Sequence, residues 1–142
     1  MATGARIRLK IRAAQRDVTG ETTEQLTHFI GEYFKRGGKF YVRYDDDTIH
    51  DSRKVKTLLK FDESSLLVKR QGIVDSEQQF EIGKAIANAY KTPYGTLDLE
   101  IFTKDLTADL NATRHILDVS YALNINGAKQ SDNTLHLEME LL

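Results

Sequence analysis

Apolar side chains recur at every second position along most of this chain, and this period constrains the fold more than any other feature. In the stretch ARIRLKIRA, residues 5–13, Ile7, Leu9 and Ile11 alternate with arginine and lysine. Successive side chains of a β-strand point to opposite faces, whereas a helix buries residues at a period of about 3.6. The stretch therefore predicts a strand with one buried and one solvated face.

The same alternation recurs at residues 54–61, 96–102, 115–125 and 134–141. Turn-forming residues separate these runs, and Gly37-Gly38 between two apolar segments predicts a hairpin. Only IGKAIANAY, residues 82–90, has alanines typical of a helix, and it is too short for more than about two turns. We therefore expect an all-β protein of about ten strands with short connections.

Composition narrows the protein class. The 142 residues fit one domain, 1–142, because no linker or low-complexity segment divides them. There is no cysteine, so disulfides and thiolate metal sites are excluded. No apolar run has the length of a signal peptide core or a membrane span. With a formal net charge of −1, we expect a cytoplasmic protein that does not bind a membrane.

The two terminal strands carry opposite charges on their outward faces. Arg6, Arg8, Lys10 and Arg12 share one face of the first strand, and Glu138 and Glu140 occupy the equivalent face of the last. Opposite charges on facing strands stabilise their pairing by roughly 0.2–1 kcal/mol per pair. Antiparallel pairing of these strands would join the two ends of the sheet. We therefore predict a closed, mostly antiparallel barrel of about eight to ten strands.

An ordered series of segments also resembles a known family. The series runs through FYVRYDDD, KVKTLLKF, LLVKRQG, QQFEIG, YKTPYGTLDLEIFTKDL and HILDVSYALNI, between residues 40 and 125. It is similar to the YwiB-like family, small uncharacterised bacterial proteins. The resemblance implies a calycin-like barrel, related in shape to lipocalins and fatty-acid-binding proteins. It implies no activity and no catalytic residues, because the family has no established function.

The sequence contains no convincing catalytic or metal-binding motif. It lacks a phosphate-binding glycine loop, a nucleophile elbow and a cysteine nucleophile, so we expect no enzyme activity. Four histidines show no paired ligand spacing: His28, His50, His115 and His136. Four carboxylates in residues 45–51 lack the EF-hand spacing and favour a solvated loop over a cation site. We predict neither a bound metal nor another cofactor.

The inward face of the predicted barrel carries the strongest functional signal. The apolar parity of Leu66 and Val68 places Arg70 inside, near a strand end. Parity also directs Tyr44 and Tyr90 inward. A buried guanidinium needs a carboxylate, solvent or an anionic ligand. We hypothesise that Arg70, assisted by the two tyrosine hydroxyls, binds the anionic end of a small amphipathic ligand.

Two other interpretations stay open from the sequence alone. Arg70 could pair with an internal acid or turn outward at its strand end. The protein could instead act as a scaffold or regulator that contacts a protein or RNA partner through its outer face. Nucleic acid is the weaker of these partners, because the basic stripe has no interleaved aromatic residues and the net charge is slightly negative. No feature of the sequence sets an oligomeric state.

Overall fold

The computed structural model describes residues 4–50 and 52–142 of the chain. Ten strands make up its regular structure: β1 (Ala5–Asp17), β2 (Thr22–Arg36), β3 (Lys39–Asp46), β4 (Val55–Phe61), β5 (Ser65–Gln71), β6 (Ser76–Glu81), β7 (Ala85–Thr92), β8 (Gly95–Leu110), β9 (Arg114–Ile125) and β10 (Ala128–Leu141). Among the described residues there is no helix with the length and hydropathy needed to span a bilayer.

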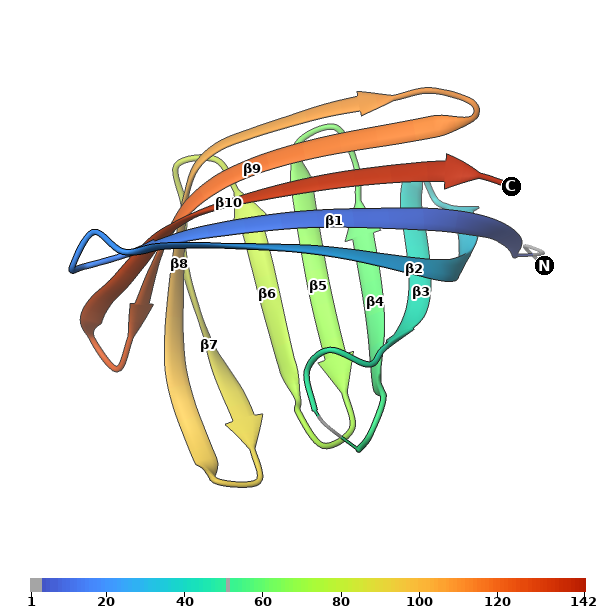
Figure 1. Cartoon of the computed structure of the whole chain (residues 1–142). Helices are drawn as coiled ribbons and strands as arrows, with labels where there is room; N and C mark the ends of the chain where they lie inside the picture. The colour runs from blue at the N-terminus through green and yellow to red at the C-terminus, as the bar shows by residue number, and fades with distance from the viewer. Residues whose placement is uncertain (1–3, 51) are drawn as a thin grey trace.

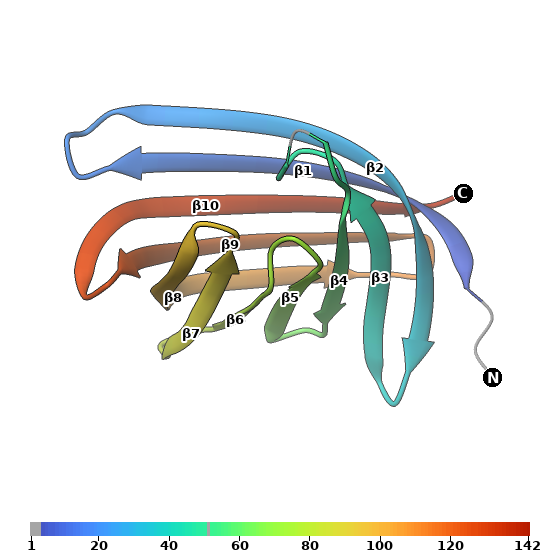
Figure 2. The same cartoon turned by 90° about the horizontal axis from the view of Figure 1, so that it is seen from below.

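All ten strands belong to one antiparallel sheet in the order β6-β5-β4-β3-β2-β1-β10-β9-β8-β7. The sheet curls on itself, so that β9, β10, β1 and β2 cross the steeply inclined β3 to β6 (Figure 1). Viewed from below, the long terminal strands form one layer and the shorter middle strands another (Figure 2). The predicted all-β, antiparallel barrel is confirmed.

The pairing of the terminal strands follows their charge pattern. In the register of β1 with β10, Lys10 faces Glu138 and Arg8 faces Glu140. The Lys10 ammonium lies 4.0 Å from a Glu138 carboxylate oxygen. Each such exposed pair contributes little, but the run of facing opposite charges disfavours a slipped register. The predicted contact between the first and last strands is therefore confirmed.

The barrel closes less completely on its other side, between β6 and β7. These two strands are the ends of the sheet order, although they are consecutive in the chain. A single isolated bridge, Asp75 to Lys91, joins their far ends in the described part of the chain. At the near end, the Lys84 amide donates to the Glu81 carbonyl across the turn. We call this incompletely paired junction the seam.

The buried core lies inside the barrel and contains side chains of alternate positions on nearly every strand. Its fully buried members include Ile7, Leu9, Leu59, Phe61 and Leu117. A β-bulge in β8 between Thr103 and Asp105 shifts the parity by one residue. Inward positions are therefore odd-numbered before the bulge and even-numbered after it, which the local alternation alone does not indicate.

Local predictions can also be compared with the structure. Gly37 and Gly38 form the β2–β3 turn with φ values of 58° and 76°, as the hairpin prediction requires. Pro93 and Tyr94 form the β7–β8 turn, in which the Thr92 hydroxyl donates to the Gly95 carbonyl at 2.9 Å. The alanine-rich segment forms strand β7, because its alternate side chains face the barrel interior.

Candidate functional site

A cavity of about 180 Å³ lies inside the barrel near the ends of β3, β4 and β5. Most of its wall is apolar, from residues such as Leu59, Val68 and Phe80. An equal number of polar residues face the same space: Gln25, Thr27, Tyr44, Asp46, Thr48, Arg70, Gln78 and Tyr121. An apolar enclosure with a few convergent polar groups is the usual composition of a small-molecule site.

Arg70 is the cation of this cavity. It stands on the inward face of β5, directly opposite Thr57 of β4 and Ser76 of β6. One of its terminal nitrogens donates to the Gln78 side-chain oxygen at 3.3 Å, while its Nε is buried and has no partner. None of the described carboxylates forms an ion pair with it. Its predicted inward orientation is confirmed, and the internal ion pair considered above is not found among the described residues.

Two tyrosines flank the Arg70 side of the cavity. Tyr44 is 7% exposed and Tyr121 is mostly buried. Burial raises the pKa of both phenols, and the nearby Arg70 charge partly offsets this rise. The Tyr44 ring packs against Phe29 at 4.6 Å, and the Tyr121 ring against Phe80 at 4.9 Å. Both phenols therefore remain protonated at neutral pH and can donate hydrogen bonds to an anion.

Tyr90, the third residue of the hypothesis, lies beyond the seam on the inward face of β7. It is partly buried and pairs with Leu97 of β8. It does not line the cavity that contains Arg70 and Tyr44. Its predicted parity is confirmed, but the structure brings only two of the three predicted side chains to one space.

The acidic segment begins inside a strand. Asp45 and Asp46 are the last residues of β3, and Asp46 is 4% exposed with its carboxylate accepting bonds from the Thr48 amide and hydroxyl. Thr48 and Ile49 continue along the cavity wall. Asp51 lies outside the described residues. The connection therefore borders the cavity.

The histidines do not gather at one place. His115 is 2% exposed in an aromatic cluster, where its Nε2 lies 3.1 Å from the Tyr33 hydroxyl. His136 stands on the outward face, with its Nδ1 2.6 Å from an Asp118 oxygen. Within the described residues no three His, Asp or Glu side chains are arranged to hold a metal.

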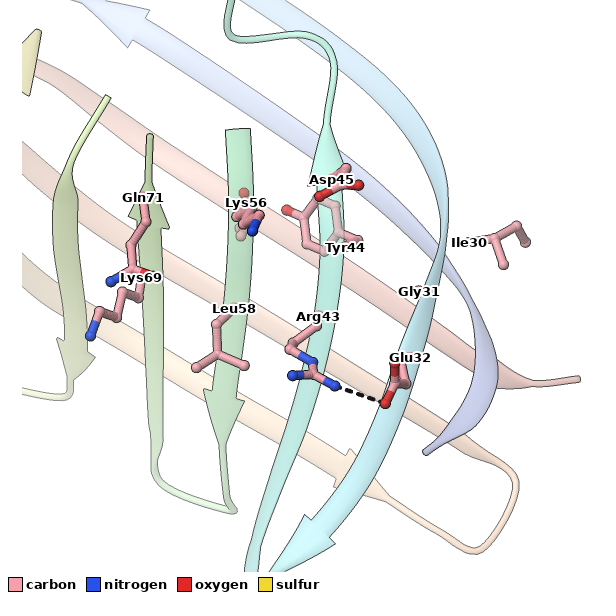
Figure 3. A pocket seen from close by; sticks show the side chains of 11 residues that line it. Ile30, Gly31, Glu32, Arg43, Tyr44, Asp45, Lys56, Leu58, Lys69 and Gln71 are labelled. Atoms are coloured by element: carbon pink, nitrogen blue, oxygen red, sulfur yellow. Dashed lines mark hydrogen bonds and ion pairs between the residues drawn. The ribbon is translucent and has the colours of Figure 1, made fainter. Parts of the chain in front are cut away.

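A second, larger hollow of about 620 Å³ lies on the outer side of β2 to β5. Figure 3 shows its lining, with Arg43 of β3 directed toward Glu32 of β2. The Arg43 guanidinium is 2.8 Å from a Glu32 oxygen, and Lys69 is 3.6 Å from Glu77. Three cationic side chains line this groove, Arg43, Lys56 and Lys69, and two of them already have acidic partners. The groove is therefore less suited to an anionic ligand.

Sequence reasoning missed several members of the inner site. Tyr121 could be assigned to the inward face of its strand, but nothing in the sequence brings it next to Arg70. Gln78 and Gln25 are glutamines without any motif, and their role follows only from the strand register. Alternation predicts the face of each strand, whereas the neighbours across a barrel depend on how the sheet curls.

Comparisons with known proteins show what the chain is similar to. Residues 7–137 match the family described as "Domain of unknown function (DUF1934)". The uncharacterized beta-barrel protein YwiB of Bacillus subtilis (strain 168) is 29% identical over 110 residues, covering 78% of this chain and 76% of YwiB. The crystal structure of the ywiB protein from Bacillus subtilis matches with a TM-score of 0.82 at 27% identity, covering 98% of this chain and 93% of that one. The predicted resemblance is thereby confirmed, and the chain belongs to the YwiB-like family of β-barrel proteins with the domain of unknown function DUF1934.

Proposed function

We propose that this protein is a non-enzymatic binding protein that holds a small amphipathic carboxylate inside its barrel. The observation that carries the proposal is the Arg70 guanidinium, which lines a mixed polar and apolar cavity and has the Gln78 amide as its one hydrogen-bond partner among the described residues. A guanidinium keeps its charge at physiological pH, so burial without an anion is costly. A ligand carboxylate would supply an anionic partner.

The cavity volume limits the ligand. An engineered apolar cavity of about 150 Å³ takes a benzene molecule. A cavity of about 180 Å³ therefore suits a ligand slightly larger than benzene, such as benzoate or hexanoate. A long-chain fatty acid would require the surrounding strands to move apart, so we expect chain length to limit affinity.

The arrangement of polar and apolar groups sets an orientation for this ligand. Its carboxylate would lie against Arg70, with the Tyr44 and Tyr121 phenols as additional donors. Its apolar part would contact Leu59, Val68 and neighbouring side chains. A guanidinium–carboxylate pair in a dry site has short, charge-assisted hydrogen bonds, which favours an anion over the corresponding amide or alcohol.

Isothermal titration of the full chain with benzoate, hexanoate, hexanamide and palmitate tests the proposal. We expect saturable binding of benzoate and hexanoate and much weaker binding of hexanamide and palmitate. The Arg70→Gln variant should weaken hexanoate binding about 10- to 100-fold, because hydrogen bonds to charged groups contribute roughly 1.5–3 kcal/mol. Equal affinity of wild type and Arg70→Gln would overturn the role of Arg70.

Arg43→Gln provides the matched control. Arg43 lies on the neighbouring strand but points outward to Glu32, so its loss should leave hexanoate affinity unchanged. If Arg43→Gln weakens binding and Arg70→Gln does not, the outer groove is the anion site. Absence of any carboxylate binding would leave the outer face as the place of function, in contact with a protein or RNA partner.

A further inference from the structure

Buried polar atoms without partners concentrate beside the seam. In the part of the chain that the structure describes, six buried side-chain atoms have no hydrogen-bond partner. Four of these six belong to Arg70, Ser76 and Asn88: Arg70 Nε, Ser76 Oγ, and both polar atoms of the Asn88 amide. Buried polar groups in folded proteins are nearly always satisfied, so a cluster of exceptions needs an explanation.

The strand register places these residues next to one another. Arg70 is directly opposite Ser76 in the β5–β6 ladder, and Val68 is opposite Gln78. The bridge between Asp75 and Lys91 fixes the alignment of β6 with β7. Counting inward from that bridge along both antiparallel strands brings Gln78 opposite Asn88. Asn88 is therefore the inward residue at the level of Gln78 across the unpaired seam, and Gln78 is the side chain that holds Arg70.

The position of Asn88 would ordinarily be apolar. Its row across the inner wall continues from Gln78 through Val68 to Leu59 and Val42, and on the other side Asn88 pairs with Leu99. An amide that loses water here without gaining a hydrogen bond destabilises the fold. A leucine would fill the position without that penalty, so the asparagine points to a polar group that occupies the site part of the time.

We infer that the ligand held by Arg70 carries, besides its carboxylate, an amide-type group that hydrogen-bonds with Asn88. An asparagine side chain has two N–H donors and an oxygen acceptor, and a carboxamide presents the complementary pair. The Ser76 hydroxyl lies in the adjoining row and is available to the same ligand. This inference rests on the proposed function and narrows its ligand class to short carboxylates with an amide group.

The ligand must pass the Gln78 side chain to reach Asn88, which does not itself line the cavity. Among the described residues, the 3.3 Å hydrogen bond from Arg70 is the one side-chain hydrogen bond of Gln78, and a carboxylate on Arg70 would release it. Between the turn and the bridge, β6 and β7 share no ladder, so a slight widening of the seam breaks no backbone pairing there. Neighbouring strands lie roughly 5 Å apart, which a four-carbon ligand can span.

Titration with succinamate and hexanoate, which have equal numbers of non-hydrogen atoms, tests the inference. We expect Asn88→Leu to weaken succinamate binding about tenfold, as for the loss of a buried hydrogen-bonding group, and to leave hexanoate binding unchanged or stronger. Arg70→Gln should weaken both ligands. Ala87→Leu, which places the same side chain on the outer face of β7, should affect neither.

Nuclear magnetic resonance of the wild-type protein gives a second readout that does not depend on a variant. Succinamate should shift the side-chain amide signals of Asn88, whereas hexanoate should not. Unmoved Asn88 signals, or an equal effect of Asn88→Leu on both ligands, would overturn this inference alone. Failure of hexanoate and succinamate to bind at all would overturn the proposed function and this inference with it.

Discussion

The two ends of the barrel interior each enclose an inward-facing nitrogen-bearing side chain, but they do so differently. At one end the His115 ring packs 4.8 Å from Phe40 and 5.6 Å from Phe61, with the Tyr33 hydroxyl on its Nε2. At the other end Arg70 faces a cavity and one amide. Strand β4 connects the two, because its inward residue Phe61 pairs with Phe40 and its inward residue Thr57, four positions earlier, pairs with Arg70.

The difference shows why a buried histidine suits the core, whereas Arg70 supports the proposed binding site. Burial lowers the pKa of His115, so the imidazole can remain neutral and accept an apolar environment. A guanidinium has no neutral form to adopt at physiological pH. Hollows border both groups, about 180 Å³ at Arg70 and about 350 Å³ at His115, so the two differ in the charge that Arg70 must keep and not in the presence of space.

The largest expected loss of stability follows from a substitution at the His115 end of the barrel interior. Phe61 is fully buried, and Phe61→Ala should lower the free energy of unfolding by about 3–5 kcal/mol, because the cavity it leaves cannot collapse. Thr57→Ala, on the same strand at the cavity end, should cost about 1 kcal/mol. Denaturant unfolding measures the free energy of unfolding of both variants. Equal losses in Phe61→Ala and Thr57→Ala would contradict the expectation that the His115 end depends more strongly on packing.

Much of this architecture could be predicted from the sequence, because alternation specifies one face of each strand. Ile7, Leu9, Val55 and Leu59 all lie on the predicted buried face. The contact between the first and last strands followed from charge, since Lys10 and Glu138 have opposite signs. The seam could not be predicted. Gly83 forms the turn between β6 and β7 with a φ of 77°, and the loss of strand pairing beyond it depends on the curl of the whole sheet.

The site was predictable in part for the same reason. The parity of Arg70 and Tyr44 placed both inside, and the register of β3, β4 and β5 sets them in one row on either side of Thr57. Tyr90 has the same parity but lies across the seam. Tyr121 reaches the cavity from β9, a strand far from β5 in the sheet order. Contacts across the interior depend on barrel geometry, about which local sequence says little.

A smaller effect is expected from acidification, and it concerns His115. Its pKa is lowered from the ordinary 6.5 by burial and by nearby Lys35, so the folded protein binds this proton less readily than the unfolded chain. Stability should therefore fall as the pH drops below 6.5 and level off below the folded pKa. The test is to measure the free energy of unfolding from pH 7.5 to 5. We expect it to fall less steeply with acidification in His115→Gln than in the wild-type protein.

His136 supplies a control of opposite sign. Hydrogen bonds to Asp118 and Glu138 raise its pKa, so its contribution is fully present below pH 6.5 and disappears as the pH rises through the folded value. Asp118 is solvent-exposed and Glu138 partly so, and His136→Gln should therefore change stability by at most ~0.5 kcal/mol, and only at the acidic end. For His115, a steeper loss of stability on acidification in His115→Gln than in the wild-type protein would contradict the inference that its imidazole stays neutral.

The smallest expected change in unfolding free energy follows from replacing Arg70. Whether stability rises or falls is the informative result. Arg70→Met keeps a long side chain but removes a half-buried charge that donates to the Gln78 amide. Replacing buried charges by apolar side chains is often neutral or stabilising, and we expect Arg70→Met to gain ~0–1 kcal/mol in unfolding free energy without ligand. Hexanoate should stabilise wild type against thermal unfolding and leave Arg70→Met unchanged, because a ligand stabilises only the state that binds it. A loss of more than about 1 kcal/mol in Arg70→Met would instead make Arg70 part of the core, as His115 is.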